Sequence, residues 1–415
     1  MAGLCAAGRA RQLGLDVVVL EKGTRPGGSM LLSSCVVWRH RTFEDFRAEC
    51  SRGNPGLQRL VWERLDDGLA WLESLGAPVV ARETGNPRTT GVRFDPRGLT
   101  EVLVRAAGRI RPNTPLASTQ PEPAGEGLVQ AAGRIRPNTP LASTQPEPAG
   151  EGLVRAAGDI RLNTPLASTQ PEPGSDGPPI VLATGGFQGS KELVHRFIRP
   201  AGDLLLRANR WSAGDGLTVA LERGGALSDG LDEFYGRAMP APPAVATEDR
   251  FVALAQLYGR HALVVDDAGE QFVHEPVSWS EVDLVQAIAR RPGARAWYLV
   301  DDAALAVRVR ERTVAEMIDA ARAAGATVLG PGELPFEVPF AYRCAVHVAA
   351  AITHTIGGIR VDARARVLRE DGTALDGLYA CGADVGGIAS GGYASGLAAA
   401  LVLGLAAAEE AARAV

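Results

Sequence analysis

The sequence predicts an α/β protein in which a parallel sheet is interrupted by a smaller α+β unit. Short apolar runs at residues 15–20 and 179–184 alternate with helical patterns, which is typical of buried parallel strands. From about residue 231 the pattern changes to short strands separated by turns. With 415 residues, of which 46% are hydrophobic, the chain exceeds the usual size of one domain. We therefore expect one domain over 1–230 and 343–415, with residues 231–342 inserted.

The N-terminal segment has the pattern of the second half of a dinucleotide-binding βαβ unit. A helix rich in alanine and glycine begins near Met1, and the apolar strand after it ends at Glu21. Gly3 fits the last glycine of G-x-G-x-x-G, where helix and strand pack too closely for a Cβ, and Glu21 is placed to bond a ribose hydroxyl. The pyrophosphate of a bound dinucleotide would lie at the helix N-terminus. The same half-motif also occurs in α/β proteins that bind no nucleotide.

The first strand and the first two glycines of this motif are absent from the chain. Such a strand is central in a parallel sheet, since it is paired on both sides and buried on both faces. Its absence predicts a gap flanked by two ladders of unpaired backbone groups. We therefore expect weak nucleotide binding, which an added upstream strand ending in G-x-G would restore.

Residues 103–177 contain a segment that repeats every 25 residues, from Leu103, Leu128 and Leu153. Each copy has one short helical piece and a tail rich in proline, glycine and glutamate, so stacking as a solenoid is not expected. A tandem duplication fits better, and we expect this region to be a loop-rich insertion.

Apolar periodicity predicts most of the other elements. One helical face ends before Gly76 and consists of Leu57, Val61, Leu65, Leu69 and Leu72. Another helix begins near Gly214, with Asp215 in its first turn. In the inserted domain, strands are expected at 262–265, 271–273 and 297–300, and an amphipathic helix at 314–324. A strand from Cys344 leads back to the first domain.

Composition excludes several kinds of partner. A net charge of −5 gives no basic surface for nucleic acid. The apolar stretch at 394–408 is shorter than the roughly 20 residues of a membrane span. The five cysteines show neither C-x-x-C spacing nor a disulfide framework, so we expect reduced thiols in a cytoplasmic protein and no metal site.

Four glycine-containing stretches occur in order along the chain. They are R-P-G-G-S at 25–29, V-L-A-T-G-G-F at 181–187, T-H-T-I-G-G-I at 353–359, and G-L-Y-A-C-G at 377–382 leading into G-G-Y-A-S-G-L at 391–397. Together they resemble the motifs of the fumarate reductase and succinate dehydrogenase flavoproteins, a family that also holds 3-ketosteroid and tricarballylate dehydrogenases. Within the third repeat copy, residues 159–166 are similar to the strand that the family has at the corresponding place in its sequence.

The resemblance implies a Rossmann-like FAD-binding domain and a capping domain that closes over the flavin. It implies non-covalent FAD, since Gly28, Ser29 and Met30 stand where covalently flavinylated relatives carry a histidine. Nicotinamide as the bound cofactor is less consistent with these motifs. The residues expected to bind FAD are Gly3, Glu21, Lys22, Gly27, Gly28, Ser29, Ala183, Thr184, Gly185, Asp215, Gly358, Gly382, Asp384, Ser395, Gly396 and Leu397.

His354 is the first catalytic candidate, because the histidine of the family's H-T-x-G-G motif contacts substrate beside the flavin. Without that motif, a histidine bonded into a strand end would be the simpler interpretation. The last helix is expected to begin near Ser395, Gly396 and Leu397, with its N-terminus directed at the flavin pyrimidine oxygen. The positive end of the helix dipole would then stabilise negative charge on the reduced ring. Tight packing of a helix rich in glycine and alanine explains the same residues equally well.

Three departures from the fumarate reductase pattern argue against a fumarate or succinate enzyme. Alignment of 269–275 on G-x-R-F-x-N-E places Trp279 where the catalytic arginine acid should be. Tyr393 stands where a second arginine clamps the dicarboxylate, so the paired charge-assisted bonds are lost. Ala383 replaces the usual glutamate, and Asp384 is the remaining candidate for its ribityl contact.

Tyr393, the second catalytic candidate, could instead bond a carbonyl. Its hydroxyl and a backbone N–H of residues 394–396 would polarise a ketone, at a spacing similar to the carbonyl site of 3-ketosteroid dehydrogenases. A buried tyrosine bonded to backbone is an equally good explanation. Five cap residues could move the proton and are not ranked by sequence: Tyr235, Tyr258, Arg260, His261 and His274.

Two functions follow from these patterns. One is an FAD-dependent oxidoreductase that transfers hydride between flavin N5 and a carbon next to the carbonyl of a small-molecule substrate, with the electron acceptor left open. The other is a truncated, non-catalytic relative that binds FAD poorly or not at all, because of the missing strand.

Overall fold

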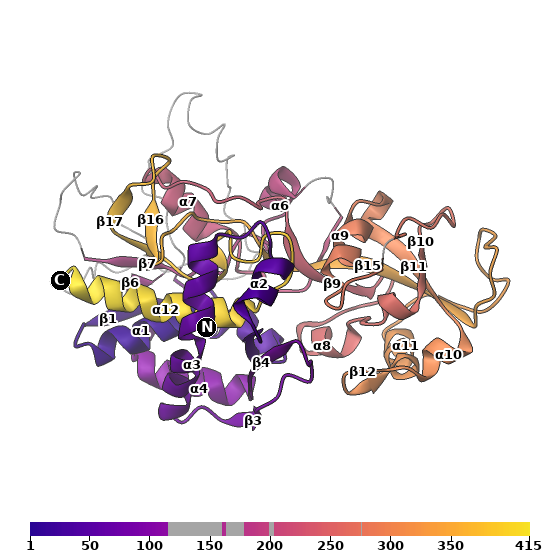
Figure 1. Ribbon diagram of the computed structural model, residues 1–415, viewed down its shortest axis with the longest axis horizontal. Coiled ribbons are helices and arrows are strands. Elements are labelled where there is room, and N and C mark those ends of the chain that lie inside the picture. Colours follow the sequence, from indigo (N-terminus) through magenta and orange to yellow (C-terminus); the bar gives the residue numbers. More distant parts are fainter. Residues whose placement is uncertain (115–159, 163–177, 199–202, 275) are drawn as a thin grey trace.

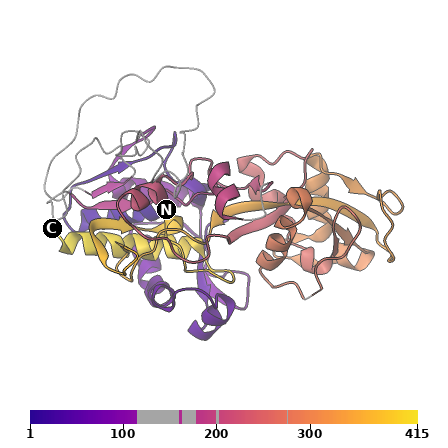
Figure 2. The ribbon, with the colours of Figure 1, turned by 90° about the horizontal axis from the view of Figure 1, so that it is seen from above.

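The computed structural model describes residues 1–114, 160–162, 178–198, 203–274 and 276–415. Its elements form two lobes, which lie side by side in Figure 1 and again in the view from above in Figure 2. One lobe contains a six-stranded sheet with the order β16-β17-β7-β6-β1-β5, called here the first sheet. The other contains the second sheet, in which β10, β11, β15 and β14 follow one another and β8 and β9 also pair with β15. The predicted α/β architecture is confirmed.

The first sheet is parallel except at one edge. Its strands are β1 (Val17–Leu20), β5 (Arg109–Arg111), β6 (Ile160–Leu162), β7 (Ile180–Leu182), β16 (Arg366–Leu368) and β17 (Ala374–Ala380). Only the pairing of β16 with β17 is antiparallel. β1 and β7 are buried apolar runs, as expected of strands covered on both faces.

The predicted gap in this sheet is absent, because β6 lies between β1 and β7. Arg161 of β6 pairs with Val18 on one side and with Ile180 on the other. The expectation of two unpaired ladders is therefore wrong. A strand from much later in the chain occupies the central position, which spacing within the N-terminal motif could not reveal.

β5 and β6 come from the first and third copies of the repeated segment. Ile110 and Ile160 are equivalent positions two periods apart, and they pair with Val19 and Val17 on opposite edges of β1. The prediction that the rest of this region is a loop-rich insertion concerns residues 115–159 and 163–177, which lie outside the described residues.

The lobe of the first sheet also contains several helices. They are α1 (Ala2–Gln12), α3 (Pro55–Ser74), α4 (Pro96–Ala107), α6 (Lys191–Phe197), α7 (Asp215–Glu222) and α12 (Gly396–Arg413). Of these, α1 and α12 pack against strands of the first sheet. α1 also packs against α12 and α4, and at Gly404 a Cβ would lie only 2.7 Å from the carbonyl oxygen of Ala2. The predicted apolar face of α3, from Leu57 to Leu72, is buried, which confirms that helix.

The second sheet is built around two long strands, β9 (Phe234–Pro240) and β15 (Cys344–Thr355), which lead from one lobe into the other (Figure 1). The remaining elements of this lobe are α8 (Phe251–Leu254), β10 (Leu263–Val265), α9 (Val282–Ala289), β11 (Arg295–Val300), α10 (Asp302–Ala306), α11 (Val314–Ala323), β14 (Val328–Leu329) and β8 (Leu205–Leu206). The strands predicted at 262–265 and 297–300 and the helix at 314–324 are confirmed. The strand predicted at 271–273 is wrong, since Gln271 makes one isolated bridge to Val265. Domain boundaries at 230/231 and 342/343 stay a prediction.

Two small β units are inserted within the sequence of the two sheets, one between β1 and β5 and the other between β11 and β14. The first is a three-stranded sheet with the order β2 (Val36–His40), β4 (Thr89–Phe94) and β3 (Val79–Ala81), and α2 (Phe43–Glu49) and α3 connect β2 to β3. The second is a hairpin of β12 (Arg308–Val309) and β13 (Arg312–Thr313). Among the described residues, no helix combines the length and the apolarity needed to cross a bilayer.

Candidate active site

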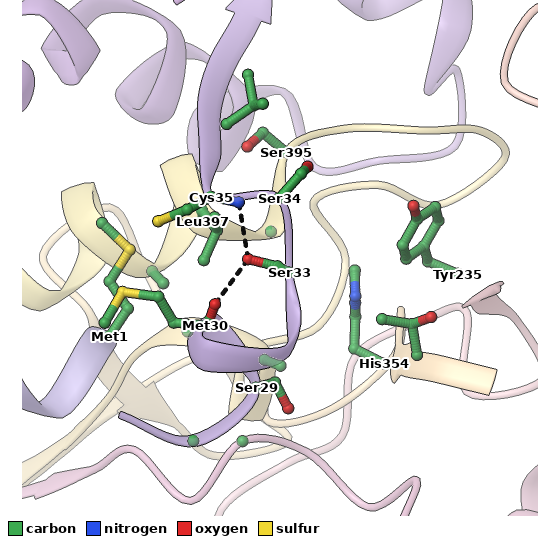
Figure 3. A pocket seen from close by; sticks show the side chains of 18 of the residues that line it. Met1, Ser29, Met30, Ser33, Ser34, Cys35, Tyr235, His354, Ser395 and Leu397 are labelled. Carbon is green, nitrogen blue, oxygen red and sulfur yellow. Dashed lines mark hydrogen bonds between the residues drawn. The ribbon is translucent and has the colours of Figure 1, made fainter. Parts of the chain in front are cut away.

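A cavity of about 600 Å³ is lined by residues of both lobes. It collects the predicted site residues of the two lobes except Gly358 and Asp384, which do not line it. Figure 3 shows His354 and Tyr235 together on one side of the cavity and Met1 on the opposite side. The cavity therefore lies where the two lobes meet.

One end of the cavity carries the predicted nucleotide contacts. Glu21, at the end of β1, accepts a hydrogen bond from the N–H of Gly23 through Oε1 at 2.8 Å. Its Oε2 has no hydrogen bond within the described residues, and burial raises the pKa of this carboxyl. Lys22 forms a 2.8 Å salt bridge with Asp215, the first residue of α7. Trp211 covers Gly23, where a Cβ would lie 3.0 Å from the indole ring.

Two glycine turns bring bare backbone to the cavity wall. Gly27 has φ 114° and is followed by a short 3₁₀ helix, Gly28–Leu32. Gly185, after β7, has φ 96°, and a Cβ there would lie 2.6 Å from Ser212 Oγ. Both positions need glycine, because the left-handed backbone and the close neighbours exclude a side chain. These turns leave room for a ligand to approach the main chain.

Asp384 holds one of these turns from behind. Its buried carboxylate accepts hydrogen bonds from Thr184 Oγ1 and the N–H of Gly186, both at 2.8 Å, and from the N–H of Thr184. Burial nevertheless raises its pKa. At Gly358 a Cβ would lie 2.4 Å from the carbonyl oxygen of Asp384. Asp384 therefore contacts the glycine turn, and Gly358 packs against Asp384 instead of lining the cavity.

The N-terminus of α12 opens into the cavity. Ser395 caps the helix, with Oγ accepting from the N–H of Ala398 at 3.2 Å. Gly396, the next residue, faces His354, since a Cβ would lie 3.2 Å from His354 Cε1. The partial positive charge of an 18-residue helix is thus directed at the cavity beside this imidazole.

His354 lies next to Tyr235 because the two residues are a cross-strand pair of β15 and β9. Their ring centroids are 5.0 Å apart. The imidazole has no hydrogen bond within the part of the chain that the structure describes, and burial lowers its pKa to about 4. At neutral pH it is therefore an uncharged ring, free to contact a ligand.

Tyr235 and Tyr393 form a stacked pair with centroids 4.8 Å apart, and the hydroxyl of Tyr393 lies 3.4 Å from that of Tyr235. Arg237, on the same face of β9 as Tyr235, places its guanidinium carbon 5.1 Å and 5.4 Å from the two ring centroids. Burial acts to raise the pKa of Tyr235, but the charges of Arg237 and Arg207 outweigh it and lower the pKa to about 8. Burial raises the pKa of Tyr393, which therefore stays protonated.

Trp38 and Trp279 complete an aromatic wall with Tyr393. Their ring centroids lie 5.1 Å and 5.5 Å from that of Tyr393. Trp279 donates from Nε1 to Glu49 Oε2 at 2.9 Å. The position expected of a catalytic arginine thus holds an indole whose only polar hydrogen is directed away, at a carboxylate.

Residues 1–397 match the family model described as FAD binding domain. This chain belongs to the FAD binding domain family. The match includes the glycine turns, His354 and the α12 N-terminus, so most of the candidate site lies on family positions.

Several proteins of known name are similar to this chain in sequence or in fold. A probable fumarate reductase of Shewanella frigidimarina is 25% identical over 239 residues, which are 50% of this chain and 39% of that protein. The chain therefore spans less than half the length of that relative. A flavocytochrome c3 fumarate reductase structure matches with a TM-score of 0.64 at 20% identity, covering 100% of this chain and 76% of the other. The 3-ketosteroid Δ1-dehydrogenase of Sterolibacterium denitrificans gives 0.66 at 15%, covering 100% and 98%. At these identities the two structures show the fold alone.

Within this member of the FAD binding domain family, three of the five unranked cap candidates line the cavity: Tyr235, Arg260 and His261. Tyr258 is fully buried, with its hydroxyl bonded to Gln256 Oε1 at 2.9 Å, and neither it nor His274 lines the cavity.

Sequence reasoning missed Arg237 and Glu281. Glu281 is buried in the cavity wall with a left-handed backbone, and it accepts from the N–H of Arg260 at 3.1 Å. Burial raises its pKa. The spacing of Tyr235 and Arg237 by two residues in a strand was a usable signal for Arg237.

Proposed function

We propose that this member of the FAD binding domain family is an FAD-dependent oxidoreductase that moves hydride between the flavin and a substrate carbon next to a carbonyl group. The observation that carries the proposal is the Tyr235–Tyr393 pair, which lies beside His354 and the N-terminus of α12. The raised pKa of Tyr393 keeps its phenol protonated, so it can donate a hydrogen bond, whereas the lowered pKa of Tyr235 suits a group that carries a proton. When bound, FAD supplies the two-electron hydride acceptor or donor at N5.

The residues present fit FAD. The turns at Gly27 and Gly185 bring main chain without side chains to the cavity wall. The free oxygen of Glu21 suits a ribose hydroxyl, and the helix N-terminus at Gly396 suits a ring that gains negative charge on reduction. We assign the predicted cofactor residues that line the cavity to direct contact, and Gly358 and Asp384 to positioning of the turn after β7. Binding would be non-covalent, since Gly28, Ser29 and Met30 offer no imidazole for a flavin bond.

Tyr393 would hold the substrate carbonyl. Its raised pKa keeps the O–H as a donor, and the N–H of Gly396 lies at an open helix terminus on the same wall. Hydrogen bonds to a carbonyl oxygen stabilise the negative charge that develops there when a conjugated C=C bond gains hydride or an α-carbon loses its proton. His354 is neutral and would orient the substrate without supplying a proton.

Tyr235 would carry the proton. In the oxidative direction its phenolate takes the proton from the α-carbon while hydride leaves the β-carbon, so the C–C single bond becomes a double bond. In the reductive direction its phenol returns that proton to the α-carbon. Trp38 and Trp279 pack against Tyr393 and would hold its ring in place during this step.

The test is reoxidation of the reduced flavin. The purified 415-residue chain is loaded with FAD, reduced with dithionite under anaerobic conditions and mixed with 2-cyclohexenone, crotonate or cyclohexene. We expect flavin absorbance to return with one or both conjugated carbonyl compounds and not with cyclohexene, whose double bond has no carbonyl to polarise. Flavin that stays reduced with both conjugated compounds would contradict the proposal.

FAD content of the same sample tests the non-catalytic alternative. Because β6 pairs with β1 and β7, we expect FAD to remain bound through gel filtration. Loss of the flavin, with retention after a G-x-G strand is added upstream, would support the truncated, non-binding alternative.

The acidified Tyr235 predicts a pH dependence. Since its pKa is lowered to about 8, the phenolate fraction rises as pH increases through about 8. The oxidative rate should therefore rise, and the reductive rate fall, through this pH in stopped-flow measurements of the flavin. His354 should add no inflection near pH 6.5, because its pKa is about 4.

Tyr235→Phe is the matched variant for this profile, since it keeps the ring and removes the hydroxyl. It should abolish the inflection near pH 8 without releasing FAD. An inflection that persists in Tyr235→Phe would assign the proton to another group.

A further inference from the structure

The substrate side of the cavity has more positive than negative charge. The arginines that line the cavity are Arg88, Arg237, Arg260, Arg308 and Arg310, and the acidic lining residues are Glu21, Asp215 and Glu281. Asp215 is neutralised by Lys22, and Glu21 lies at the nucleotide end. Only Glu281 remains to balance the arginines on the side of the second lobe.

Arg237 is the central member of this group. Its side chain is 4% exposed and lies against both catalytic tyrosine candidates. Its Nη1 donates to the carbonyl oxygen of Ser280, and no carboxylate of the described residues lies within salt-bridge distance. Tyr235, Tyr393 and Glu281 are the neighbouring groups whose negative charge, when they ionise, favours this buried guanidinium. A ligand carboxylate would add a permanent negative charge and paired charge-assisted hydrogen bonds.

The neighbouring walls restrict the shape of that ligand. Tyr235, Tyr393, Trp38 and Trp279 present aromatic rings to the same space. Such rings favour a flat, conjugated skeleton, which offers its π face for stacking. A planar guanidinium among them suits a carboxylate, because its parallel N–H groups can bind both oxygens.

We propose that the substrate of this site is a flat conjugated carbonyl compound that carries a carboxylate, and that Arg237 binds this carboxylate. The inference rests on the proposed function and narrows its substrate class. It is separate from the two arginines of the fumarate pattern, whose positions hold Trp279 and Tyr393. A neutral ketone would not form these charge-assisted bonds with Arg237.

The test compares two ligands of nearly the same size and shape, one with a carboxylate and one with a neutral amide. The FAD-loaded chain is titrated with benzoate and with benzamide, and binding is followed by the shift of the flavin visible spectrum, which needs no turnover. We expect benzoate to bind roughly tenfold to a hundredfold more tightly than benzamide. In Arg237→Met this preference should disappear, with benzamide affinity unchanged, and Arg237→Lys should restore part of it.

Equal affinities for the two ligands, or no spectral response to benzoate, would overturn the inference, and both results come from the unmodified protein even if Arg237→Met fails to fold. Arg295→Met is a control outside the cavity lining and should keep the preference for benzoate. If only this inference fails, conjugated carbonyl compounds still reoxidise the flavin but benzoate is not preferred to benzamide. If the proposed function fails, conjugated carbonyl compounds do not reoxidise the flavin, whichever of the two ligands binds more tightly.

Discussion

Replacing Tyr393 by phenylalanine is expected to slow reoxidation of the reduced flavin by a conjugated carbonyl compound by about 10²- to 10³-fold, the usual loss when one donor to a developing oxyanion is removed. The aromatic ring remains, so its packing against Trp38, Trp279 and Tyr235 is kept. FAD content and the melting temperature should therefore stay unchanged. Stopped-flow absorbance under anaerobic conditions measures the rate.

Tyr342→Phe is the matched control. The hydroxyl of Tyr342 bonds to the carbonyl oxygen of Gly330 at 3.2 Å in the second lobe, and the residue does not line the cavity. This variant should react at the unmodified rate. If Tyr393→Phe also keeps its rate to within about threefold, the carbonyl is held by another donor, since a lost oxyanion donor costs far more.

Arg161→Pro is expected to destabilise the fold by about 3 kcal/mol, because proline cannot donate a ladder hydrogen bond and leaves a buried partner unpaired. Arg161 is the residue of β6 that pairs on both sides, with Val18 and Ile180. A loss of this size is a large part of a typical folding free energy of roughly 5–15 kcal/mol. Denaturant unfolding followed by circular dichroism measures it, and FAD should be released as well.

Glu370→Pro is the control for this variant. Glu370 is exposed in the turn between β16 and β17, and its N–H donates no hydrogen bond within the described residues, so this variant should leave unfolding and FAD content unchanged. Equal effects of the two substitutions, or none for Arg161→Pro, would show that β6 does not complete the sheet.

The elements that depend on local pattern were predictable. The apolar face of α3, the strand before Gly185 and the helix beginning at Asp215 follow from spacing that nearby residues determine. The two lobes follow from the change in pattern near residue 231. Residues that line the cavity were predicted where they belong to a sequence motif, as for His354 and Gly396.

Features set by pairing between distant strands were not predictable. The place of β6 at the centre of the sheet depends on pairing between segments far apart in the sequence. Periodicity within one sequence does not show which strands are adjacent in a sheet. Tyr235 could not be ranked above Tyr258, because only the register of β9 on β15 places it beside His354. The acidifying effect of Arg237 and Arg207 likewise arises from burial and proximity in three dimensions.

The origin of β6 in a tandem copy has a genetic consequence. A parallel crossover needs only about a dozen residues, while residues 112–159 separate β5 from β6. Unequal recombination within the repeated DNA would lengthen or shorten this connection in steps of 25 residues and still deliver one strand to each edge of β1. A deletion that left a single copy, by contrast, would leave one edge of β1 without its partner strand.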